Sequence, residues 1–300
     1  MKLKKLLKEA QSIVESLRVT KGGNFRLKDH NPADTRGVKN KEKAEKLLAH
    51  GAQLLSHFQE RLYAQQEWSV LLILQGMDAA GKDGVVEHVM SGVNPEGCEV
   101  TSFKQPSKAE LDHDFLWRAH NRVPERGKIG IFNRSYYEEV LVVKVHQELL
   151  APQRLPKSLV GKDFWENRYE DINNFEKYLT HSGVVVLKFF LHLSKGEQKR
   201  RFLDRLEMPE KNWKFSMADV KERASWGDYQ AAYEEMIQNT ATRRVPWHVI
   251  PADNKWFTRV AVAAVVIEAL HSLDLRFPEV DDEKKRELAK VRRALLDGKE

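Results

Sequence analysis

Short apolar runs alternate with amphipathic segments through most of this sequence. Five of the runs have the length and composition of strands buried on both faces, and each is followed by a segment whose apolar residues have helical spacing. They are Val70–Gln75, Val100–Phe103, Ile129–Phe132, Val184–Leu191 and His248–Ile250. Because parallel strands need crossover helices, this alternation predicts a doubly wound α/β fold, with a five-stranded parallel sheet and helices on both faces.

The two ends of the chain have a different pattern from the middle. Residues 1–66 contain no convincing strand, and we expect an N-terminal helical extension there, with a polar, turn-rich loop between its helices. Residues 67–278 hold the alternating strands and helices of the α/β domain. Residues 279–300 form a charged C-terminal tail, which is either a solvated helix or a frayed end.

Composition and charge narrow the class of protein. Of the 300 residues 41% are hydrophobic, and 50 basic residues against 44 acidic ones give a formal net charge of +6. This modest excess suits an anionic partner. The single cysteine, Cys98, excludes an internal disulfide and a zinc site built on cysteines. The longest apolar window, Val260–Leu270, is well short of the roughly 20 residues that cross a bilayer, so we expect a cytoplasmic protein without a membrane partner.

The segment after the first strand has the spacing of a phosphate-binding loop, and it lies where ligands bind in such sheets. In GMDAAGKDG, Gly76 and Gly81 flank four residues and Lys82 follows. The glycines let the backbone N–H groups point inward, the next helix adds its positive N-terminus, and the lysine reaches the transferred phosphate. The alternative is a tight turn with a surface lysine. The other loop residues expected at the phosphates are Ala79, Ala80, Asp83 and Gly84.

This loop lacks the hydroxyl residue that usually follows the lysine and binds magnesium. Asp83 stands in its place, and a second aspartate, Asp78, lies inside the loop. A carboxylate beside phosphates is repelled unless a divalent cation lies between them, so Asp78 is a candidate magnesium ligand. Asp83 has a simpler interpretation, because an acidic residue in the first helical turn complements the helix dipole.

The third strand is followed by another polar segment, NRSYYEE, residues 133–139. We expect Arg134 to clamp phosphate oxygens with its planar guanidinium, the alternative being an ion pair with a nearby glutamate. Asn133 can hydrogen-bond water or phosphate but is a weak metal ligand, and Glu138 and Glu139, on the following helix, are the candidate acidic ligands. Adjacent residues of a helix diverge by about 100 degrees and cannot both face one phosphate, and we favour Glu138.

Together, GMDAAGKDG and FNRSYYEEVLV resemble the two signature motifs of the type-2 polyphosphate kinase family. Further blocks match in the same order, namely KQPSKAELDHDFLWRAH, LKFFLHLSKGEQKRRF and NWKF, and the similarity extends from about Asp29 to about Pro278. The resemblance implies a P-loop kinase fold, dependence on magnesium with manganese as a substitute, and reversible phosphoryl transfer between inorganic polyphosphate and nucleotides.

One departure from the family pattern bears on the acceptor. Many members carry Asp where this chain has Asn133. That difference and the YYEEVLV continuation are similar to the class III subfamily, which accepts both nucleoside monophosphates and diphosphates. The resemblance therefore implies AMP and ADP as acceptors, with GMP and GDP as further ones.

The acceptor nucleotide is expected beside the second strand. Arg118 and Arg122 lie one turn apart in DHDFLWRAHNR, on one face of an expected helix. The family resemblance implies that Arg118 binds the acceptor phosphate, whereas the pattern alone indicates an exposed basic face. The remaining residues expected around this nucleotide are Phe103, Lys104, Gln105 and Arg134, of which Phe103 could equally be a core residue.

The donor polyphosphate is expected at the basic segment after the fourth strand, residues 199–223. Arg201 and Arg205 share a helical face there, and Lys211 and Lys214 fall in a stretch broken by Pro209. Cations on a lid over about residues 205–222 can close on a polyanion and exclude water. A merely solvated helix is the alternative.

These parts predict in-line transfer of the terminal phosphoryl group of polyphosphate to a nucleotide, without a covalent enzyme intermediate. We expect a homo-oligomer, a dimer or a tetramer. We expect no nucleic-acid partner, because the chain lacks the basic stripe with interleaved aromatic residues of a strand-binding groove. Two alternatives remain: an ATP-dependent P-loop kinase for a nucleotide or another small molecule, and a polyanion-binding module without catalysis.

Overall fold

The structure is a computed structural model that describes residues 3–213 and 215–298. Its centre is a six-stranded sheet with the strand order β1-β6-β5-β2-β4-β3. Five of these strands are mutually parallel and confirm the predicted sheet, so their carboxyl ends lie along one edge. They are β2 (Ser69–Gln75), β3 (Cys98–Ser102), β4 (Ile129–Asn133), β5 (Val184–His192) and β6 (Trp247–Pro251).

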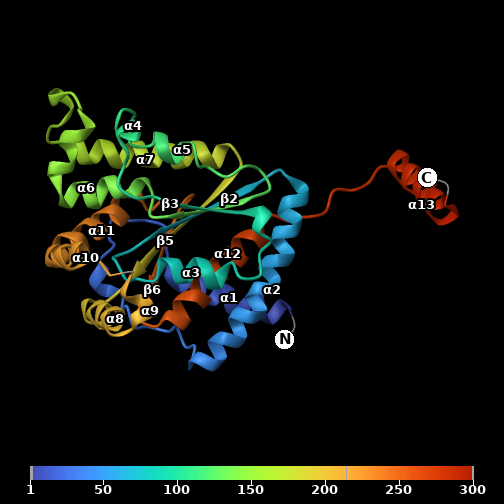
Figure 1. Cartoon of the computed structure of the whole chain (residues 1–300), viewed down its shortest axis with the longest axis horizontal. Coiled ribbons are helices and arrows are strands. Elements are labelled where there is room, and N and C mark those ends of the chain that lie inside the picture. The colour runs from blue at the N-terminus through green and yellow to red at the C-terminus, as the bar shows by residue number, and fades with distance from the viewer. Residues whose placement is uncertain (1–2, 214, 299–300) are drawn as a thin grey trace.

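Helices cover both faces of the sheet (Figure 1). On one face Val70, Leu72 and Leu74 of β2 belong to a core shared with α1, α2, α3 and α12. On the other face Leu71 and Ile73 belong to a core shared with α7 and α11. Both sides of β2 are therefore apolar, which is why its sequence is an almost continuous apolar run. These helices span Leu3–Leu17 (α1), Lys41–Gln65 (α2), Lys82–Val89 (α3), Phe164–His181 (α7), Trp226–Thr240 (α11) and Lys255–Ser272 (α12).

Short helices form much of the chain between the strands and the longer helices. Two of them, α4 and α5, lie beside α7 at the top of Figure 1. The short helices are η1 (Leu27–Asp29), η2 (Pro95–Gly97), α4 (Lys108–Leu111), α5 (Trp117–His120), η3 (Tyr136–Val140), α6 (Val142–Val145), η4 (Gln147–Gln153), η5 (Lys157–Leu159) and η6 (Arg223–Ser225).

The N-terminal extension contributes a strand, which corrects the expectation of none before residue 67. β1 (Arg18–Val19) pairs antiparallel with β6, with Arg18 opposite His248 and Val19 opposite Trp247. A strand of two residues has no alternation to recognise, and its pairing depends on contacts distant in sequence. An ion pair between Arg18 and Glu268 ties β1 to α12, on which α1 also packs.

The strand predicted at Val100–Phe103 is not buried on both faces as expected. β3 lies at the edge of the sheet, where it pairs with β4, and Val100 is 48% exposed. Phe103 follows the end of β3 and is buried. Valine and threonine suit an edge strand as well as a central one, so composition could not distinguish the two positions.

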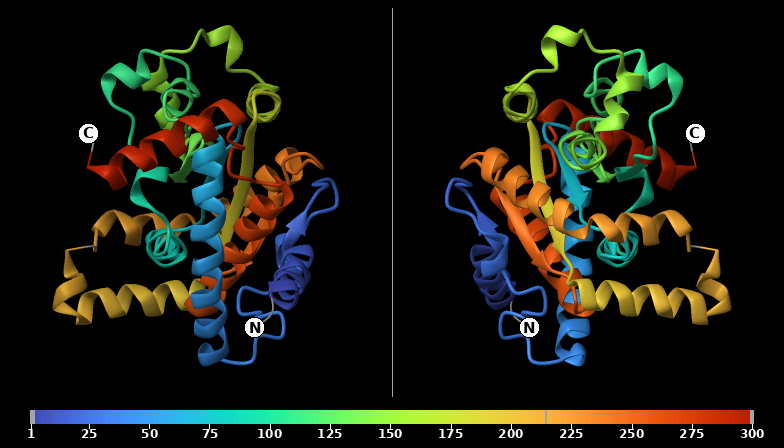
Figure 2. Two further views of the ribbon diagram at one scale, coloured as in Figure 1. Left: turned by 90° about the vertical axis from the view of Figure 1, so that its right-hand side faces the viewer. Right: turned by 90° about the vertical axis from the view of Figure 1, so that its left-hand side faces the viewer.

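Two segments project from the body of the protein. α8 (Lys195–Glu207), α9 (Pro209–Asn212) and α10 (Met217–Glu222) form an arm on the side of α3, seen in gold and orange in Figure 2. α13 (Asp282–Asp297) follows an extended linker, has no buried residue and lies apart from the body in Figure 1. Within residues 3–298, residue 214 excepted, no helix combines the length and apolar character that crossing a membrane requires.

Candidate active site

The loop between β2 and α3 curls tightly at the carboxyl edge of the sheet. Gly76 has a φ of +156°, and a Cβ there would lie 2.8 Å from the carbonyl oxygen of Leu191. Gly81, with a φ of +104°, is the N-cap of α3, and Ala79 is also left-handed. The close approach of β5 and the left-handed backbone therefore explain both glycines. The N-terminus of α3 opens into the loop, as a phosphate site requires.

Lys82, the first residue of α3, folds back onto this loop. Its Nζ donates to the carbonyl oxygens of Gly76 at 2.6 Å and Met77 at 3.3 Å. Burial lowers the pKa of this ammonium group, and the neighbouring Arg134 lowers the pKa further. The amine is therefore held at the loop in surroundings where water contributes little, and a phosphate could take over its two hydrogen bonds.

Arg134 links the loop to the end of β4. Its guanidinium contacts Oδ1 of Asp78 at 2.8 Å and Oε2 of Glu138 at 3.5 Å. Burial acts to lower the pKa of Arg134, but Glu138 and Asp78 outweigh burial and the pKa is raised. The Arg134 backbone is left-handed, with a φ of 63°, which is rare for a residue with a side chain. Arg134 thus points toward the glycine loop and also forms an ion pair with a glutamate. The two interpretations given for this residue are therefore compatible.

Glu138 lies on the loop side of η3. Burial raises the pKa of its carboxyl, while Arg134 and Lys82 oppose the increase. With its amide nitrogen turned toward Glu138, Gln75 donates to Oε1 at 3.0 Å. Glu138 is thereby brought together with Asp78 and Lys82 around a single arginine.

Glu139 points to a different group of residues. Its carboxylate contacts Nε of Arg168 at 3.1 Å and accepts a hydrogen bond from Nε2 of Gln153 at 2.9 Å. Neighbouring residues of η3 diverge, as expected of any helix. The structure does not bring Glu139, the other proposed metal ligand, to Asp78.

Asn133 and Asp83 are in direct contact. Nδ2 of Asn133 donates to Oδ1 of Asp83 at 2.6 Å. Asp83 therefore ties the first turn of α3 to the end of β4, in addition to any effect on the helix dipole. An aspartate at position 133 would place two carboxylates in contact, which is unfavourable unless a cation or a proton joins them.

Phe103, Lys104 and Arg118 form a group on the acceptor side. Phe103 is a core residue, packed edge-on against Phe132 with ring centroids 4.9 Å apart. The Arg118 guanidinium lies 5.2 Å from the centroid of the Phe103 ring and donates to the carbonyl oxygen of Lys104 at 2.8 Å. Phe103 thus supports Arg118, and the small part of its surface that stays exposed lines the cavity at the loop. Lys104 and Gln105 line the cavity at the loop.

The single helix expected for Arg118 and Arg122 is interrupted. α5 has four residues and ends at His120, so Arg122 lies outside it. The residue before a proline avoids the helical conformation, and Val123 precedes Pro124 here. The two arginines therefore do not share a helical face. The pKa of Glu110 is lowered, mainly by the hydrogen bond from the Ser107 backbone N–H and further by the charges of both arginines.

Arg201 is not a lid residue, which corrects the prediction for it. Its guanidinium is 3% exposed and lies beneath the glycine loop. It donates to the carbonyl oxygens of Ala79 at 2.8 Å, Ala80 at 3.1 Å and Ala252 at 2.6 Å. Glu197 pairs with its Nε at 2.7 Å. The bonds to Ala79 and Ala80 hold the loop in shape, and all four contacts engage Arg201 with the protein itself.

The other proposed lid cations lie on the projecting arm. Arg205 pairs with Asp219 at 3.2 Å, which joins α8 to α10. Lys211 contacts the sulfur of Met208 at 2.7 Å and lines the cavity at the loop. Lys214 lies outside the described residues. Burial raises the pKa of the Asp219 carboxyl, and the negative charge of Asp78 raises it further.

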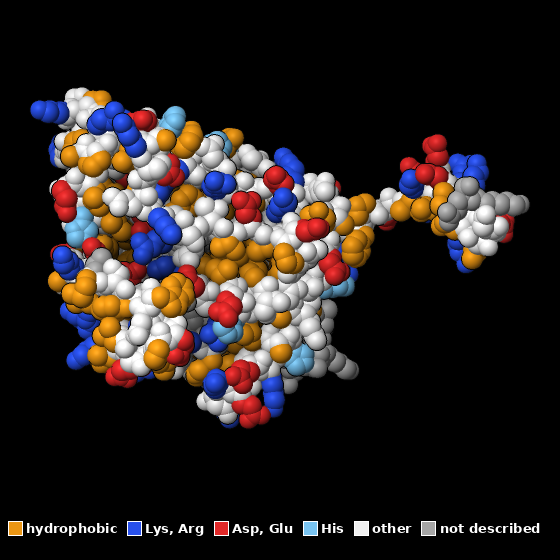
Figure 3. All heavy atoms as spheres, viewed as in Figure 1, with side chains coloured by type: hydrophobic (Ala, Val, Ile, Leu, Met, Phe, Trp, Pro, Cys, Tyr) orange, Lys and Arg blue, Asp and Glu red, His pale blue; other side chains and the backbone are white. Residues whose placement is uncertain are grey.

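One cavity of ≈ 660 Å³ unites most of these groups. Figure 3 shows Lys and Arg side chains gathered at the hollow between the α4–α7 part of the molecule and the α8–α9 arm. Lys255 and Arg259, on the first turns of α12, were not predicted. Their position after β6 and their spacing of four residues could have revealed them, because the rule for strand ends applies to β6 too. The cations that line the cavity are Lys82, Lys104, Arg134, Arg201, Arg205, Lys211, Lys255 and Arg259.

Known proteins resemble this chain over most of its length. Residues 38–278 match the family described as Polyphosphate kinase 2. The ADP-polyphosphate phosphotransferase of Rhodopseudomonas palustris is 51% identical over 257 residues, covering 85% of this chain and 89% of that protein. The AMP/ADP-polyphosphate phosphotransferase of Meiothermus ruber is 43% identical over 267 residues, covering 89% of this chain and 96% of that protein.

A solved structure also matches the fold. The crystal structure of polyphosphate kinase 2 from Arthrobacter aurescens TC1 superposes with a TM-score of 0.85 and 40% sequence identity, covering 93% of this chain and 97% of that one. These matches confirm the resemblance drawn from the loop and the NRSYYEE motif. The chain belongs to the polyphosphate kinase 2 family.

Proposed function

We propose that this protein transfers phosphoryl groups between inorganic polyphosphate and nucleoside mono- or diphosphates. The names of the two relatives support polyphosphate as the donor and AMP or ADP as the acceptor. The observation that carries the proposal is the cavity, where a glycine loop, the N-terminus of α3 and cations from separate strand ends meet. A site of this kind suits two polyanions that must be brought together.

The chemistry needs positioning and charge neutralisation more than proton transfer. The transition state of phosphoryl transfer is loose, with charge spread over the equatorial oxygens. The loop N–H groups, Lys82 and Arg134 are placed to bind those oxygens. A phosphate oxygen that acts as nucleophile is already ionised near neutral pH, so no strong base is required. Asn133, a poor base that is bonded to Asp83, is consistent with this mechanism.

The carboxylates at the loop fit a magnesium ion. Asp78 and Glu138 contact the same guanidinium, so both carboxylates lie at the end of the Arg134 side chain. Kinase sites hold Mg²⁺ with one or two carboxylates together with substrate phosphates and water, so two are sufficient. Among the residues described, no three acidic, histidine or cysteine side chains form a complete metal site. When bound, Mg²⁺ or Mn²⁺ would neutralise phosphate charge, with Asp78 and Glu138 as its protein ligands.

The donor is expected to lie along the cations of the arm and of α12. Arg205, Lys211, Lys255 and Arg259 line the side of the cavity formed by α8, α9 and α12. Burial lowers the pKa of Lys255, and Arg201 and Lys211 lower it further, because like charges are close together there. An extended polyanion would relieve that repulsion.

The decisive test is an assay with Mg²⁺ and polyphosphate, offering AMP and then ADP and resolving the products. We expect ADP and ATP to form, and the reverse reaction to occur when ATP is in excess. Lys82→Ala should reduce the rate by about a hundredfold or more, because it removes a donor to the transferred phosphate. Lys46→Ala is the matched control, since Lys46 is exposed on α2 and far from the loop in sequence.

Three results would contradict the proposal. A near-normal rate for Lys82→Ala would mean that transfer does not occur at this loop. A protein that ignores polyphosphate but uses ATP with a small acceptor would be an ordinary P-loop kinase. Salt-sensitive binding of polyphosphate without turnover would indicate a binding module.

A further inference from the structure

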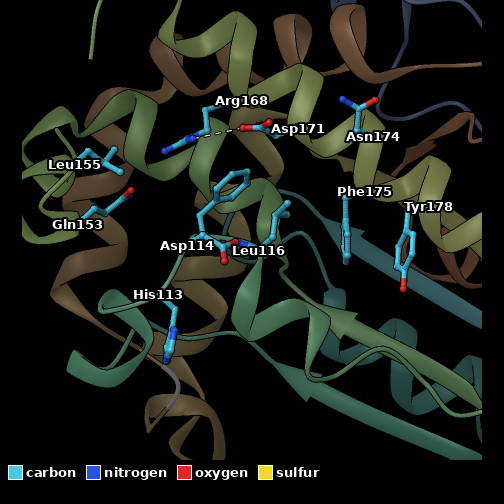
Figure 4. Close-up of a pocket in the computed structure, with 11 residues that line it drawn as sticks. His113, Asp114, Leu116, Gln153, Leu155, Arg168, Asp171, Asn174, Phe175 and Tyr178 are labelled. Carbon is cyan, nitrogen blue, oxygen red and sulfur yellow. Dashed lines mark hydrogen bonds and ion pairs between the residues drawn. The ribbon is translucent and has the colours of Figure 1, made fainter. Parts of the chain in front are cut away.

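A pocket and a helix lie outside the glycine-loop cavity. The pocket, of ≈ 490 Å³, is between α7 and the loop that leads into α5, and Figure 4 shows Arg168 and Gln153 among its lining residues. Both of these bind Glu139, which is next to Glu138 in η3. The pocket therefore adjoins the active site. The helix is α13, which lies apart from the body in Figure 1 and has no part in the chemistry described above.

α13 carries an exposed stripe of apolar side chains. Leu288, Val291 and Leu295 are 51%, 49% and 59% exposed, and their spacing of three and four residues places them on one face of the helix. The helix is well defined at its ends, where Asp281 caps the N-terminus and Gly298 follows in the left-handed conformation. A helix of 16 residues is marginal by itself in water, because most helical stability comes from packing an apolar face. The stripe therefore predicts an occupant.

The spacing of the stripe suits a second copy of the same helix. In two parallel helices related by a two-fold axis, each seam residue faces its own counterpart, so Leu288, Val291 and Leu295 each form an apolar layer. In an antiparallel pair Leu288 would face Val291, and Leu295 would face the charged Lys284. Parallel pairing therefore buries more of the stripe.

The charged residues beside the stripe favour the same arrangement. Glu287 and Arg292 flank the seam on opposite sides, and Arg292 is five positions later, the offset at which flanking side chains of two parallel helices meet. Two symmetric ion pairs would form in this way. In an antiparallel pair Lys285 would face Arg292 of the other copy, and like charges repel. Within one chain Glu287 contacts Lys284 at 2.6 Å, an exposed ion pair of the kind that contributes little.

The position of α13 leaves room for a second chain. α12 ends at Ser272 and α13 begins at Asp282, and the extended linker between them passes α2, where the Phe277 ring centroid lies 5.6 Å from the Arg61 guanidinium. α13 also lies beyond the family match, which ends at residue 278. Two bodies can therefore be joined through one pair of helices without a contact between the bodies.

We propose that α13 pairs in parallel with α13 of a second copy of this chain, with Leu288, Val291 and Leu295 as the seam. The inference goes beyond the proposed function and does not depend on it. It gives the expected homo-oligomer a defined contact surface. Leu296 is also exposed, at 70%, but it lies beside the seam and stays in solvent when the helices pair.

Sedimentation velocity over about a hundredfold range of protein concentration tests the pairing. Leu288→Lys places a charge in the seam of both copies, and we expect the concentration at half-association to rise at least about tenfold. Leu296→Lys is the matched control, because it makes the same change on the same helix outside the seam. It should leave that concentration within about twofold of the full chain. Because α13 has no buried residue, both variants should keep the fold of the body.

Disulfide formation reports the direction of pairing. In a chain whose half-buried Cys98 is replaced by serine, Leu288→Cys places two identical thiols across the two-fold axis, within reach of a disulfide. We expect a covalent dimer under mild oxidation. Arg286→Cys, on the opposite face of the helix, should remain uncrosslinked.

Three results would overturn the inference. The first is a full chain whose association is the same in Leu288→Lys. The second is equal cross-linking of Leu288→Cys and Arg286→Cys. The third is cross-linking that occurs only between Leu288→Cys and Val291→Cys chains, which would show an antiparallel pair. Neither experiment uses polyphosphate or a nucleotide, so a failed transfer assay would overturn the proposed function and leave this result intact.

Discussion

The side chain of Arg201 connects the glycine loop to the segment that follows β6. Its guanidinium binds carbonyl oxygens of Ala79 and Ala80 in the loop and of Ala252 after β6. Carbonyl groups at such a tight turn have no partner in a regular helix or strand, and leaving them unpaired is costly when they are buried. A fixed charge therefore shapes the loop through its carbonyl groups.

Arg201→Met should destabilise the protein rather than only weaken donor binding. The variant leaves several buried carbonyl groups without a donor, and we expect a loss of about 3–5 kcal/mol in the free energy of unfolding, measured by urea denaturation. Arg200→Met is the matched control. Arg200 is exposed and pairs with Glu197 and Asp204 at the surface, so its loss should cost about 1 kcal/mol or less. Unchanged stability of Arg201→Met with a raised KM for polyphosphate would restore the lid interpretation.

At the scale of elements, η3 is fixed from beneath by a fully buried polar network. Nζ of Lys188, on β5, binds Glu176 of α7 at 2.7 Å and the hydroxyl of Tyr137 at 3.0 Å. Glu176 in turn accepts the hydroxyl groups of Tyr136 at 3.0 Å and Tyr137 at 2.7 Å. Both tyrosines belong to η3, so this network sets the turn that aims Glu138 at the glycine loop.

Glu176→Gln should break this network. The change leaves the Lys188 ammonium buried without a counter-charge, and we expect a loss of about 3–5 kcal/mol in the free energy of unfolding. The double variant Glu176→Gln with Lys188→Met should recover part of the loss, because the unpaired charge is gone. Glu45→Gln on α2, which removes the exposed pair with Lys41, should change the free energy by about 1 kcal/mol or less. A double variant less stable than Glu176→Gln would show that Lys188 is not the cause of the destabilisation.

The contrast between these elements explains what the sequence could and could not predict. The five parallel strands and the glycine loop were predictable because each is a local pattern: an apolar run, or glycines at fixed spacing. β1 was missed because two residues carry no period, and its pairing is made by β6 far along the chain. The role of Arg201 was predicted wrongly and Lys255 was not predicted at all. The position of each depends on contacts with residues that are distant in sequence.

On the scale of the whole molecule, the two terminal segments differ in how they join the body. Ile13, Val14 and Leu17 of α1 are buried in the core that includes α12, and β1 extends the sheet. α13 buries no residue and lies beyond the family match, which ends at residue 278. The two predicted boundaries therefore differ. The boundary after residue 66 divides parts of the chain that share one hydrophobic core, whereas the boundary after residue 278 divides the body from a helix that has no buried residue.

Truncation from either end should reveal this difference. Deleting residues 1–24 exposes the α12 surface that Ile13, Val14 and Leu17 cover. Burial of a large aliphatic side chain contributes about 1.5–3 kcal/mol, so three of them approach the full stability of a typical domain. We expect that variant to unfold at a much lower urea concentration or to be recovered unfolded. Deleting residues 279–300 removes α13, which has no buried residue, so the urea midpoint and the transfer rate should match those of the full chain. Equal midpoints for the two truncations would mean that α1 contributes no more to the fold than α13, and that its buried residues are replaced by other contacts.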